Sequence, residues 1–354
     1  MVRVRLSPGE SLGFSFRQTP DGDGRWGQVH FSPRADESEA DWLVVYDTPE
    51  PGLITRVPRA RRIVLLPEPV SIKTYPASFI AQFGIVLSPS PVRVEGVRWV
   101  RMHPCAPWFL GCTVGGRERG GVSTGFRTFE NAGLAALEAG GAGRARLSAI
   151  CSRKRLNRNQ VRRLRFLDRL KRELGPDLDI FGRGFSDLPD KARGIVPYRY
   201  HMVLENNLER CAWTEKLADP LLAGVYPIFA GGEGLDEHFD PKGFSRIDIT
   251  RPRAAVEKVR EILESDPVAR PDVQAAMREN RRRLMHEHQL FPVLAREILE
   301  GDGASRARGD SEGLLDTPEV ILPAPRRTSA RVAQFLRPLR IAADKLVLTV
   351  FERG

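Results

Sequence analysis

Short apolar runs rich in β-branched residues recur along the first part of the chain, as in buried strands of parallel sheets. Residues 41–46, 62–66 and 83–87 have this character. At the N-terminus, residues 2–6 alternate apolar and polar side chains, which predicts a half-buried strand. The glycine-rich stretch at about 104–143 has few periodic apolar positions, so we interpret it as a connection between domains.

After residue 145 the pattern changes to strands that alternate with helices. The predicted strands lie at 146–151, 178–181, 200–204 and 226–229. The predicted helices lie at 158–174, 214–223, 253–265 and 271–300. This alternation predicts βαβ units and a parallel sheet, and therefore an α/β fold.

A chain of 354 residues is long enough for two domains. We assign residues 1–145 to an N-terminal domain that includes the connecting loop, and residues 146–300 to a C-terminal domain. Residues 301–325 are rich in Gly, Asp and Pro and are interpreted as a linker, and residues 326–354 as a basic amphipathic tail.

The formal net charge of +10 is concentrated in two places. Residues 153–172 carry ten Lys or Arg against one Asp, and residues 324–354 carry seven basic residues against two acidic ones. Such charge attracts polyanions. The first cluster has an apolar helical stripe and only Phe166 as an aromatic, so we expect no nucleic-acid partner. The tail favours peripheral contact with an acidic membrane surface, or packing on its own protein.

No apolar run approaches the roughly 20 residues that span a bilayer, and the N-terminus lacks the apolar core of a signal peptide. We therefore expect a cytoplasmic protein, peripheral at the inner membrane face if the tail binds lipid. The four cysteines have no CxxC spacing and are interpreted as free thiols. Neither Asp-x-Asp string (21–23 and 177–179) follows a strand in the manner of a metal-diphosphate site, so no obligatory metal is expected.

Polar residues follow the predicted strand at 200–204, where ligands bind in open parallel sheets. Glu205 and Asn206 come directly after the strand, and Thr214-Glu215-Lys216 opens the next helix. One interpretation of the triplet is an N-cap with a surface salt bridge. The other is that Lys216 and the helix N–H groups hold phosphate, while Glu215 accepts hydrogen bonds from sugar hydroxyls. Both interpretations stay open on the residues alone.

These residues belong to a longer pattern that resembles the donor-binding signature of glycosyltransferase family 10, the α1,3/4-fucosyltransferases of bacterial type. The pattern consists of Y-R-Y-H-M-V-L-E-N at 198–206, T-E-K at 214–216, Y-P-I-F at 226–229 and F-D-P-K-G-F at 239–244. Upstream, D-I-F-G-R at 179–183 and the Arg-rich helix at 163–170 extend it. The resemblance covers about residues 146–250.

The resemblance implies a GT-B architecture, in which two Rossmann-like parallel-sheet domains face a central cleft. It implies an inverting transferase that moves fucose from GDP-fucose to a hydroxyl of a saccharide or glycolipid acceptor. By position, Arg163 and Lys216 would contact the pyrophosphate, and Glu215 the ribose or sugar hydroxyls. The remaining donor-pocket residues implied are Ser152, Glu205 and Asn206. His201 stands where animal members of the family often have Tyr, which alters the contacts to guanine or sugar.

Departure of a sugar from a diphosphate develops negative charge on the leaving phosphate, and fixed cations stabilise that transition state. The acceptor hydroxyl needs a base from the opposite domain. Glu68 is the candidate, because it follows the strand at 62–66 and is held between Pro67 and Pro69. An exposed loop glutamate is the alternative interpretation. Two other functions stay open: a related transferase that uses another nucleotide sugar, and a non-catalytic or nucleic-acid-binding protein on the same fold.

Overall fold

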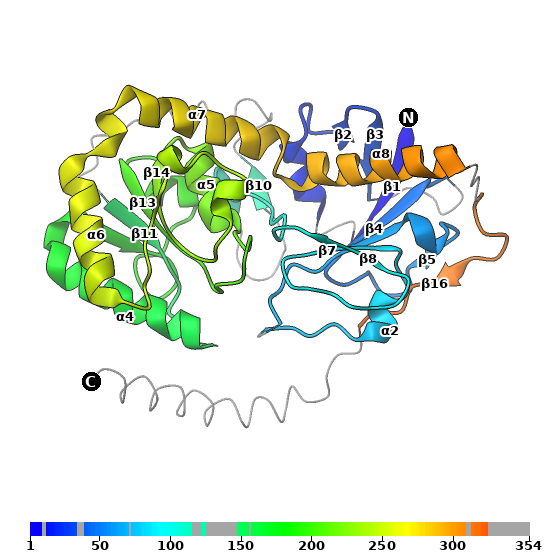
Figure 1. Ribbon diagram of the computed structural model, residues 1–354, viewed down its shortest axis with the longest axis horizontal. Helices are drawn as coiled ribbons and strands as arrows, with labels where there is room; N and C mark the ends of the chain where they lie inside the picture. The colour runs from blue at the N-terminus through cyan, green and yellow to red at the C-terminus, as the bar shows by residue number, and fades with distance from the viewer. Residues whose placement is uncertain are drawn as a thin grey trace.

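The computed structural model describes residues 1–8, 12–33, 39–70, 72–114, 122–124, 147–155, 157–308 and 313–324. These residues form two α/β halves. The long helix α7 (Pro271–His286) runs along the C-terminal half, and α8 (Leu290–Arg308) runs along the N-terminal half (Figure 1). None of the helices in these ranges is long and apolar enough to cross a membrane.

The N-terminal half is built on a sheet in the order β2-β3-β1-β4-β6-β7-β8. Its strands are β1 (Val2–Ser7), β2 (Arg25–Trp26), β3 (Val29–Ser32), β4 (Trp42–Tyr46), β6 (Arg62–Leu65), β7 (Ile85–Ser88) and β8 (Arg98–Arg101). All neighbours pair in parallel except β2 and β3. The four strands predicted in this half are confirmed within two residues. The pattern did not predict β2, β3 or β8, which are short or carry charged ends.

Side chains of this sheet alternate between two apolar cores, as the pleat requires. Val44 and its neighbours on one face pack against Phe291 and Leu294 of α8. Val45 and its neighbours on the other face pack with Phe79 of the short helix α2 (Ala77–Ile80). The sheet is therefore covered on both faces, which is why its central strands β4, β6 and β7 are buried along nearly their whole length.

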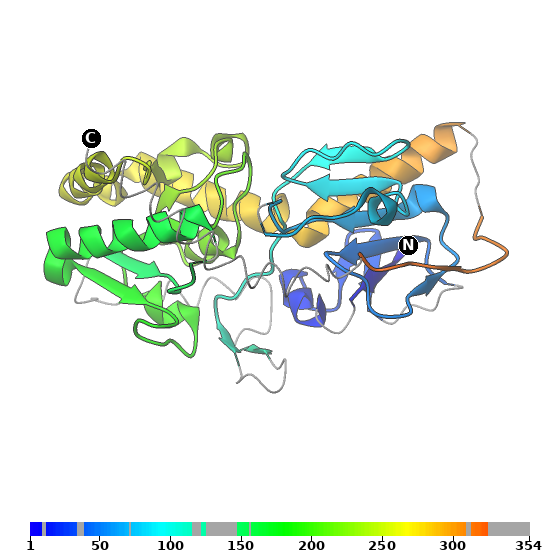
Figure 2. The ribbon, with the colours of Figure 1, turned by 90° about the horizontal axis from the view of Figure 1, so that it is seen from below.

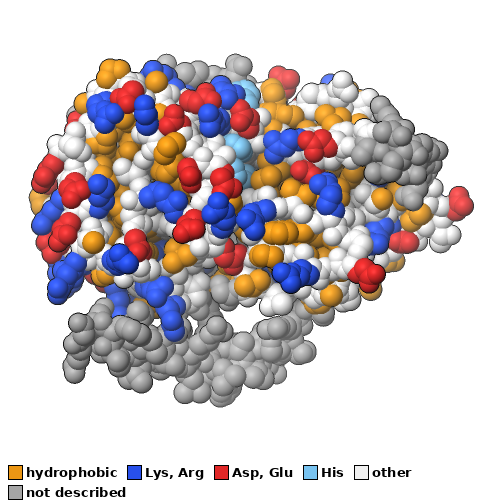
Figure 3. Space-filling view, in the orientation of Figure 1, with side chains coloured by type: hydrophobic (Ala, Val, Ile, Leu, Met, Phe, Trp, Pro, Cys, Tyr) orange, Lys and Arg blue, Asp and Glu red, His pale blue; other side chains and the backbone are white. Residues whose placement is uncertain are grey.

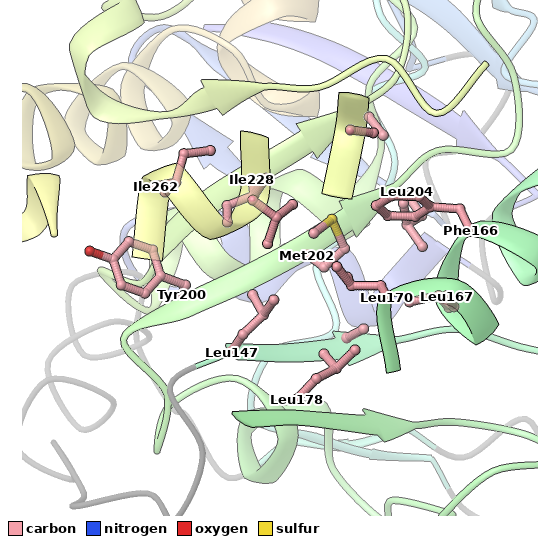
Figure 4. Packing of buried hydrophobic residues seen from close by; sticks show 14 of the residues in the cluster. Leu147, Phe166, Leu167, Leu170, Leu178, Tyr200, Met202, Leu204, Ile228 and Ile262 are labelled. Atoms are coloured by element: carbon pink, nitrogen blue, oxygen red, sulfur yellow. The ribbon is translucent and has the colours of Figure 1, made fainter. Parts of the chain in front are cut away.

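The C-terminal half carries a second sheet in the order β12-β11-β13-β14-β15, with every pair parallel. Its strands are β11 (Leu147–Ile150), β12 (Leu178–Phe181), β13 (Tyr200–Leu204), β14 (Tyr226–Ala230) and β15 (Ser245–Arg246). Helices α4 (Arg158–Leu174) and α6 (Pro252–Ser265) cover one face, with the core shown in Figure 4. Helix α5 (Glu215–Leu222) packs on the other face.

The remaining elements are short. They are the antiparallel pairs β9 (Cys112–Val114) with β10 (Val122–Thr124) and β5 (Ile54–Thr55) with β16 (Glu319–Val320), and the 3₁₀ turns η1 (Gly13–Gln18), η2 (Arg59–Arg61), η3 (Gly175–Asp177), η4 (Lys191–Gly194), η5 (Leu235–Glu237), η6 (Pro241–Gly243) and η7 (Pro267–Ala269).

The structure corrects the expected single helix over 271–300, which is interrupted between α7 and α8. The Gln289 side chain accepts a hydrogen bond from the Phe291 N–H at 3.1 Å and donates to the Gln18 carbonyl at 2.9 Å. After this break, α8 lies along the N-terminal sheet (Figures 1 and 2). The expected C-terminal domain boundary at residue 300 therefore does not match the packing, because residues 290–298 belong to the N-terminal core.

The stretch expected to be a linker, 301–325, also differs where it is described. Helix α8 continues to Arg308, β16 pairs with β5, and Ile321 is buried in the N-terminal core. These contacts attach the segment to the N-terminal half. The expected basic tail at 326–354 lies outside the described residues, as does most of the glycine-rich connection.

The two halves meet through specific contacts. His103 of the N-terminal half stacks on Trp213 of the C-terminal half, with ring centroids 3.9 Å apart. Histidine side chains reach the surface between the halves (Figure 3). Arg17 donates to the carbonyls of Trp108 and Leu110, whose side chains are in the C-terminal core. The predicted α/β fold class is confirmed: the protein has two domains, each built on a largely parallel sheet.

Candidate functional site

A cavity of about 200 Å³ lies at the carboxyl edge of the C-terminal sheet. Its lining comes from the ends of β11 and β12, the inner part of β13, the turn η4 and the first turns of α5. The lining residues are Ile150, Cys151, Ser152, Gly182, Arg183, Lys191, Ile195, His201, Met202, Glu215, Lys216 and Asp219. This is the place where an open parallel sheet binds ligands.

The first turn of α5 presents both charges of the Thr-Glu-Lys triplet to the cavity. The Thr214 hydroxyl caps the helix by accepting from the Lys216 backbone N–H at 3.4 Å. Lys216 Nζ lies 3.2 Å from Glu215 Oε1 and 3.1 Å from the Thr214 hydroxyl. Burial alone would raise the pKa of Glu215, but Lys216 and Lys191 outweigh it and lower the pKa to about 2. The capping interpretation is therefore confirmed, and the same turn brings Glu215 and Lys216 to the cavity.

Lys191 of η4 is a second cation on this wall. Its Nζ lies 2.9 Å from Asp219 Oδ2 and 3.6 Å from Glu215 Oε1. The other oxygen of Asp219 accepts the backbone N–H groups of Phe109 and Leu110, at 2.9 and 3.0 Å. Asp219 is fully buried and thus joins the interdomain connection, Lys191 and α5 in one network.

Ser152 and His201, which the sequence analysis expects in a donor pocket, both line the cavity. His201 is buried in β13, and its Nδ1 lies 2.7 Å from the Ser148 hydroxyl. Burial, with a smaller effect of Lys191, lowers the pKa of His201 to about 3. The imidazole is therefore neutral near pH 7 and acts as a hydrogen-bonding group rather than a cation.

Gly182 forms the part of the wall between β12 and Arg183. Its φ of +107° is rarely adopted by other residues, and a Cβ here would lie 2.5 Å from the Cys151 carbonyl oxygen. Only glycine allows the backbone after β12 to approach β11 this closely.

Glu205 is buried behind the cavity and is not among its lining residues. Its carboxylate accepts the Thr214 backbone N–H at 2.8 Å and the Thr214 hydroxyl at 2.9 Å, and lies 3.7 Å from Lys216 Nζ. Burial raises its pKa, although Lys216 and the Thr214 donors lower it. Asn206 is half-buried, and its carbonyl accepts from Asn157 at 3.4 Å. Both residues hold the site in place from behind.

Arg163 of α4 is 2% exposed and likewise does not line the cavity. Its Nη1 donates to the Leu204 carbonyl at 3.0 Å, and its Nε has no hydrogen-bond partner. Burial raises the pKa of Cys151, and the Arg163 charge opposes that shift. The geometry therefore puts Arg163 outside the lining of the cavity, whereas Arg183 and Lys191 are the arginine and the second lysine that line it.

Glu68 approaches from the other domain. It is exposed on the loop after β6, and its charge interacts with Lys216 and Glu215. Partial desolvation raises the pKa of Glu68, as do Asp47 and Glu215, while Lys73 and Lys216 oppose the shift. The carboxyl ends of the two sheets face one another, since the Ser90 hydroxyl after β7 donates a hydrogen bond to the Glu209 carboxylate after β13.

Three further residues that line the cavity, Lys191, Asp219 and Arg183, were not predicted from the sequence as site residues. Asp219 carried a signal, since it is a carboxylate among apolar residues one helical turn after Glu215. Lys191 lies in an irregular polar segment, where nothing local distinguishes it. Within the part of the chain that the structure describes, no three His, Cys, Asp or Glu side chains are grouped to hold a metal ion.

Cys105, Cys151 and Cys211 are buried free thiols. Burial raises the pKa of the Cys151 thiol even though it lines the cavity, so it is a wall residue and not an activated nucleophile.

No protein-family model matches the chain, and no curated protein sequence does. Among solved structures, it is similar to an α1,3-fucosyltransferase with GDP-fucose, at 14% identity and a TM-score of 0.46, over 89% of this chain and 93% of that one. The α1,3-fucosyltransferase with GDP gives the same identity and TM-score over 89% and 92%. A glycosyltransferase from Rickettsia africae ESF-5 shows 10% identity and a TM-score of 0.42, over 85% and 97%. These structural neighbours are glycosyltransferases, and at such identities the likeness assigns no donor or acceptor to this chain.

Proposed function

We propose that the protein is an inverting glycosyltransferase that moves a sugar, fucose from GDP-fucose by preference, to a hydroxyl of a saccharide acceptor. One observation carries the proposal. Glu68 of the N-terminal domain interacts electrostatically with Lys216 and Glu215 of the C-terminal domain, and these two line the cavity. The proposal therefore assigns Glu68 as the base and Lys216 as part of the cationic wall of one site between the two domains.

The cavity supplies the chemistry of the donor half. Lys216, Lys191 and Arg183 line it as cations that would hold a diphosphate and stabilise the charge that develops when it leaves. Glu215 is kept ionised by its two lysine neighbours, so it accepts hydrogen bonds from sugar or ribose hydroxyls. Neutral His201 and Ser152 add hydrogen-bonding groups to the same wall.

The acceptor half needs only a base. Glu68 would take the proton of the acceptor hydroxyl while that oxygen bonds to the anomeric carbon. The bond from the anomeric carbon to the phosphate oxygen breaks in the same step, and the diphosphate leaves with the electron pair. Because diphosphate is a good leaving group, no general acid is required.

The choice of GDP-fucose rests on the signature at 198–206, 214–216 and 226–229. A related transferase with another nucleotide sugar would use the same wall. The two enzymes would differ in the base and the sugar that their donor pockets accept. His201, which stands where animal members of family 10 often have Tyr, is a position at which such a difference would arise.

The test is a panel of GDP- and UDP-sugars, with affinity measured by calorimetry and nucleotide release measured with mixed saccharide acceptors. We expect GDP-fucose to bind and to release GDP. Lys216→Ala should lower the rate by roughly 10²- to 10³-fold, whereas the control Lys258→Ala, on an exposed face of α6, should leave it unchanged. A folded protein that binds no nucleotide sugar would contradict the proposal, and turnover with a different sugar would favour the related transferase.

A further inference from the structure

A polar network lies beside Glu68 at the carboxyl edge of the N-terminal sheet. Asp47 directly follows β4 and has a φ of +66°, which is uncommon for a residue other than glycine. Its backbone N–H donates to the Leu65 carbonyl at 2.9 Å. A residue keeps such a backbone conformation when its surroundings fix it, and such residues cluster at functional sites.

The Asp47 carboxylate is held by two donors from the loop that follows Glu68. Lys73 Nζ lies 2.7 Å from Asp47 Oδ1 and also donates to the Thr48 hydroxyl at 2.7 Å. The Tyr75 hydroxyl donates to the same Asp47 oxygen. The loop is thereby tied to the end of β4, although Glu68 itself stays exposed.

The loop itself connects this network to Glu68. The Lys73 backbone N–H donates to the carbonyl of Pro69, the residue after Glu68, at 3.0 Å. The Tyr75 ring stacks on Phe79 of α2, with centroids 6.2 Å apart, and Lys73 Nζ lies 4.8 Å from the ring centre. The Tyr75 hydroxyl therefore has a fixed place against the Asp47 carboxylate, and the loop that carries Glu68 is held there with it.

The network also sets the electrostatics of Glu68. Partial desolvation raises the pKa of Glu68, and the Asp47 charge raises it further. Lys73 opposes this shift, so the network contains both signs of charge. A carboxylate with a raised pKa is a stronger base towards a hydroxyl proton.

We infer that Tyr75 and Asp47 are positioning residues for Glu68, which they orient and tune as the base that accepts the acceptor proton. The inference rests on the proposed function, since it requires a base at Glu68. Neither residue needs to touch the substrate: Tyr75 ties the loop that carries Glu68 to the end of β4, and Asp47 accepts that bond and supplies the neighbouring charge.

The test compares Tyr75→Phe and Asp47→Asn with the wild-type enzyme and with Tyr226→Phe. The control removes a buried hydroxyl that contacts Ser245 at 3.0 Å, at the opposite end of the C-terminal sheet. Tyr75→Phe should lower kcat by roughly 10- to 100-fold through misplacement of Glu68, with the calorimetric affinity for the donor unchanged. Asp47→Asn removes a charge that raises the pKa of Glu68, so the acidic limb of kcat/KM should move to lower pH. Asn suits the left-handed backbone at this position, which favours folding of the variant.

Thermal unfolding of each variant shows whether it is folded. If Asp47→Asn does not fold, the role is tested with Tyr75→Phe, which keeps the aromatic ring. The positioning role alone is overturned if the wild-type enzyme is active, kcat of Tyr75→Phe equals that of the wild type, and the acidic limb of kcat/KM does not move in Asp47→Asn. A wild-type enzyme that neither binds nor turns over a nucleotide sugar overturns the proposed function and this inference together.

Discussion

Lys191 and Glu215 lie 3.6 Å apart at the edge of the cavity, although 23 residues separate them in the chain. The Lys191 charge also contacts Asp219 at 2.9 Å. One lysine thus pairs with two carboxylates of α5 and also lines the cavity. The pair shows that the cationic wall is assembled from separate segments and not from the Thr-Glu-Lys triplet alone.

Replacing Lys191 by Met should weaken nucleotide-sugar binding by roughly 10- to 100-fold, the cost of one hydrogen bond to a charged group. Calorimetric titration with GDP-fucose and with GDP checks this. Because the substitution leaves buried Asp219 without its cation, the double variant Lys191→Met/Asp219→Asn serves as the control for stability. Unchanged affinity for GDP in both variants would remove Lys191 from the donor site.

Glu205→Gln should destabilise the protein by about 1–3 kcal/mol, since the neutral amide no longer pairs with Lys216 and an NH₂ group replaces the oxygen that accepts from the Thr214 hydroxyl at 2.9 Å. Urea unfolding at pH 7 measures the change. Asn207→Ala is a useful comparison, because its side chain only accepts from the nearby Glu209 N–H in the half-buried turn. Equal unfolding midpoints for wild type and Glu205→Gln would show that the carboxylate is dispensable for the fold.

Gly182→Ala should destabilise the protein by more than about 1 kcal/mol and weaken donor binding. The added Cβ would meet the Cys151 carbonyl oxygen at 2.5 Å and push apart β11 and the cavity wall. Gly52→Ala is a matched control, since Gly52 also has a positive φ, of +74°, but nothing lies within 4 Å of its Cβ position. If crowding by the added Cβ, and not the positive φ alone, causes the destabilisation, Gly182→Ala must unfold at a lower temperature than Gly52→Ala.

Stability should fall as the pH drops below about 6.5, because four histidines are held neutral in the folded state. Burial lowers the pKa of His201 to about 3 and, with His238 and Arg296 adding to the effect, that of His288 to about 4. Burial also lowers the pKa of His103 and His238. The unfolded chain takes up these protons first, so each histidine removes about 1.4 kcal/mol of stability per pH unit below 6.5 until its folded-state pKa is reached.

Urea unfolding at several pH values between about 7.5 and 4.5 measures how the free energy of unfolding changes with pH. His201→Gln isolates one histidine, and its slope should be smaller than that of the wild type by about 1.4 kcal/mol per pH unit. Identical slopes for the two proteins would mean that His201 is not the buried neutral group that the structure describes.

Much of the C-terminal domain could be predicted because its signals are local. The bounds of α4, β12 and β13 agree with the pattern, and Thr214 caps α5 as expected. Apolar spacing and capping chemistry act over a few residues, so a sequence records them directly. The break between α7 and α8 could not be predicted, since it depends on contacts of Gln289 with Gln18, 271 residues away.

The sequence by itself determined the α/β class, the resemblance to a donor-binding signature, and the positions of Ser152, Glu215 and Lys216 after predicted strands. Only the tertiary structure decided which charges share the cavity: it brought in Lys191 and Arg183, and left Arg163 and Glu205 buried outside its lining. It also decided that α8 belongs to the N-terminal core and that the charges of Glu68 and Lys216 interact. The physical reason is that burial and charge pairing depend on how distant segments dock, whereas periodicity and capping depend on neighbours along the chain.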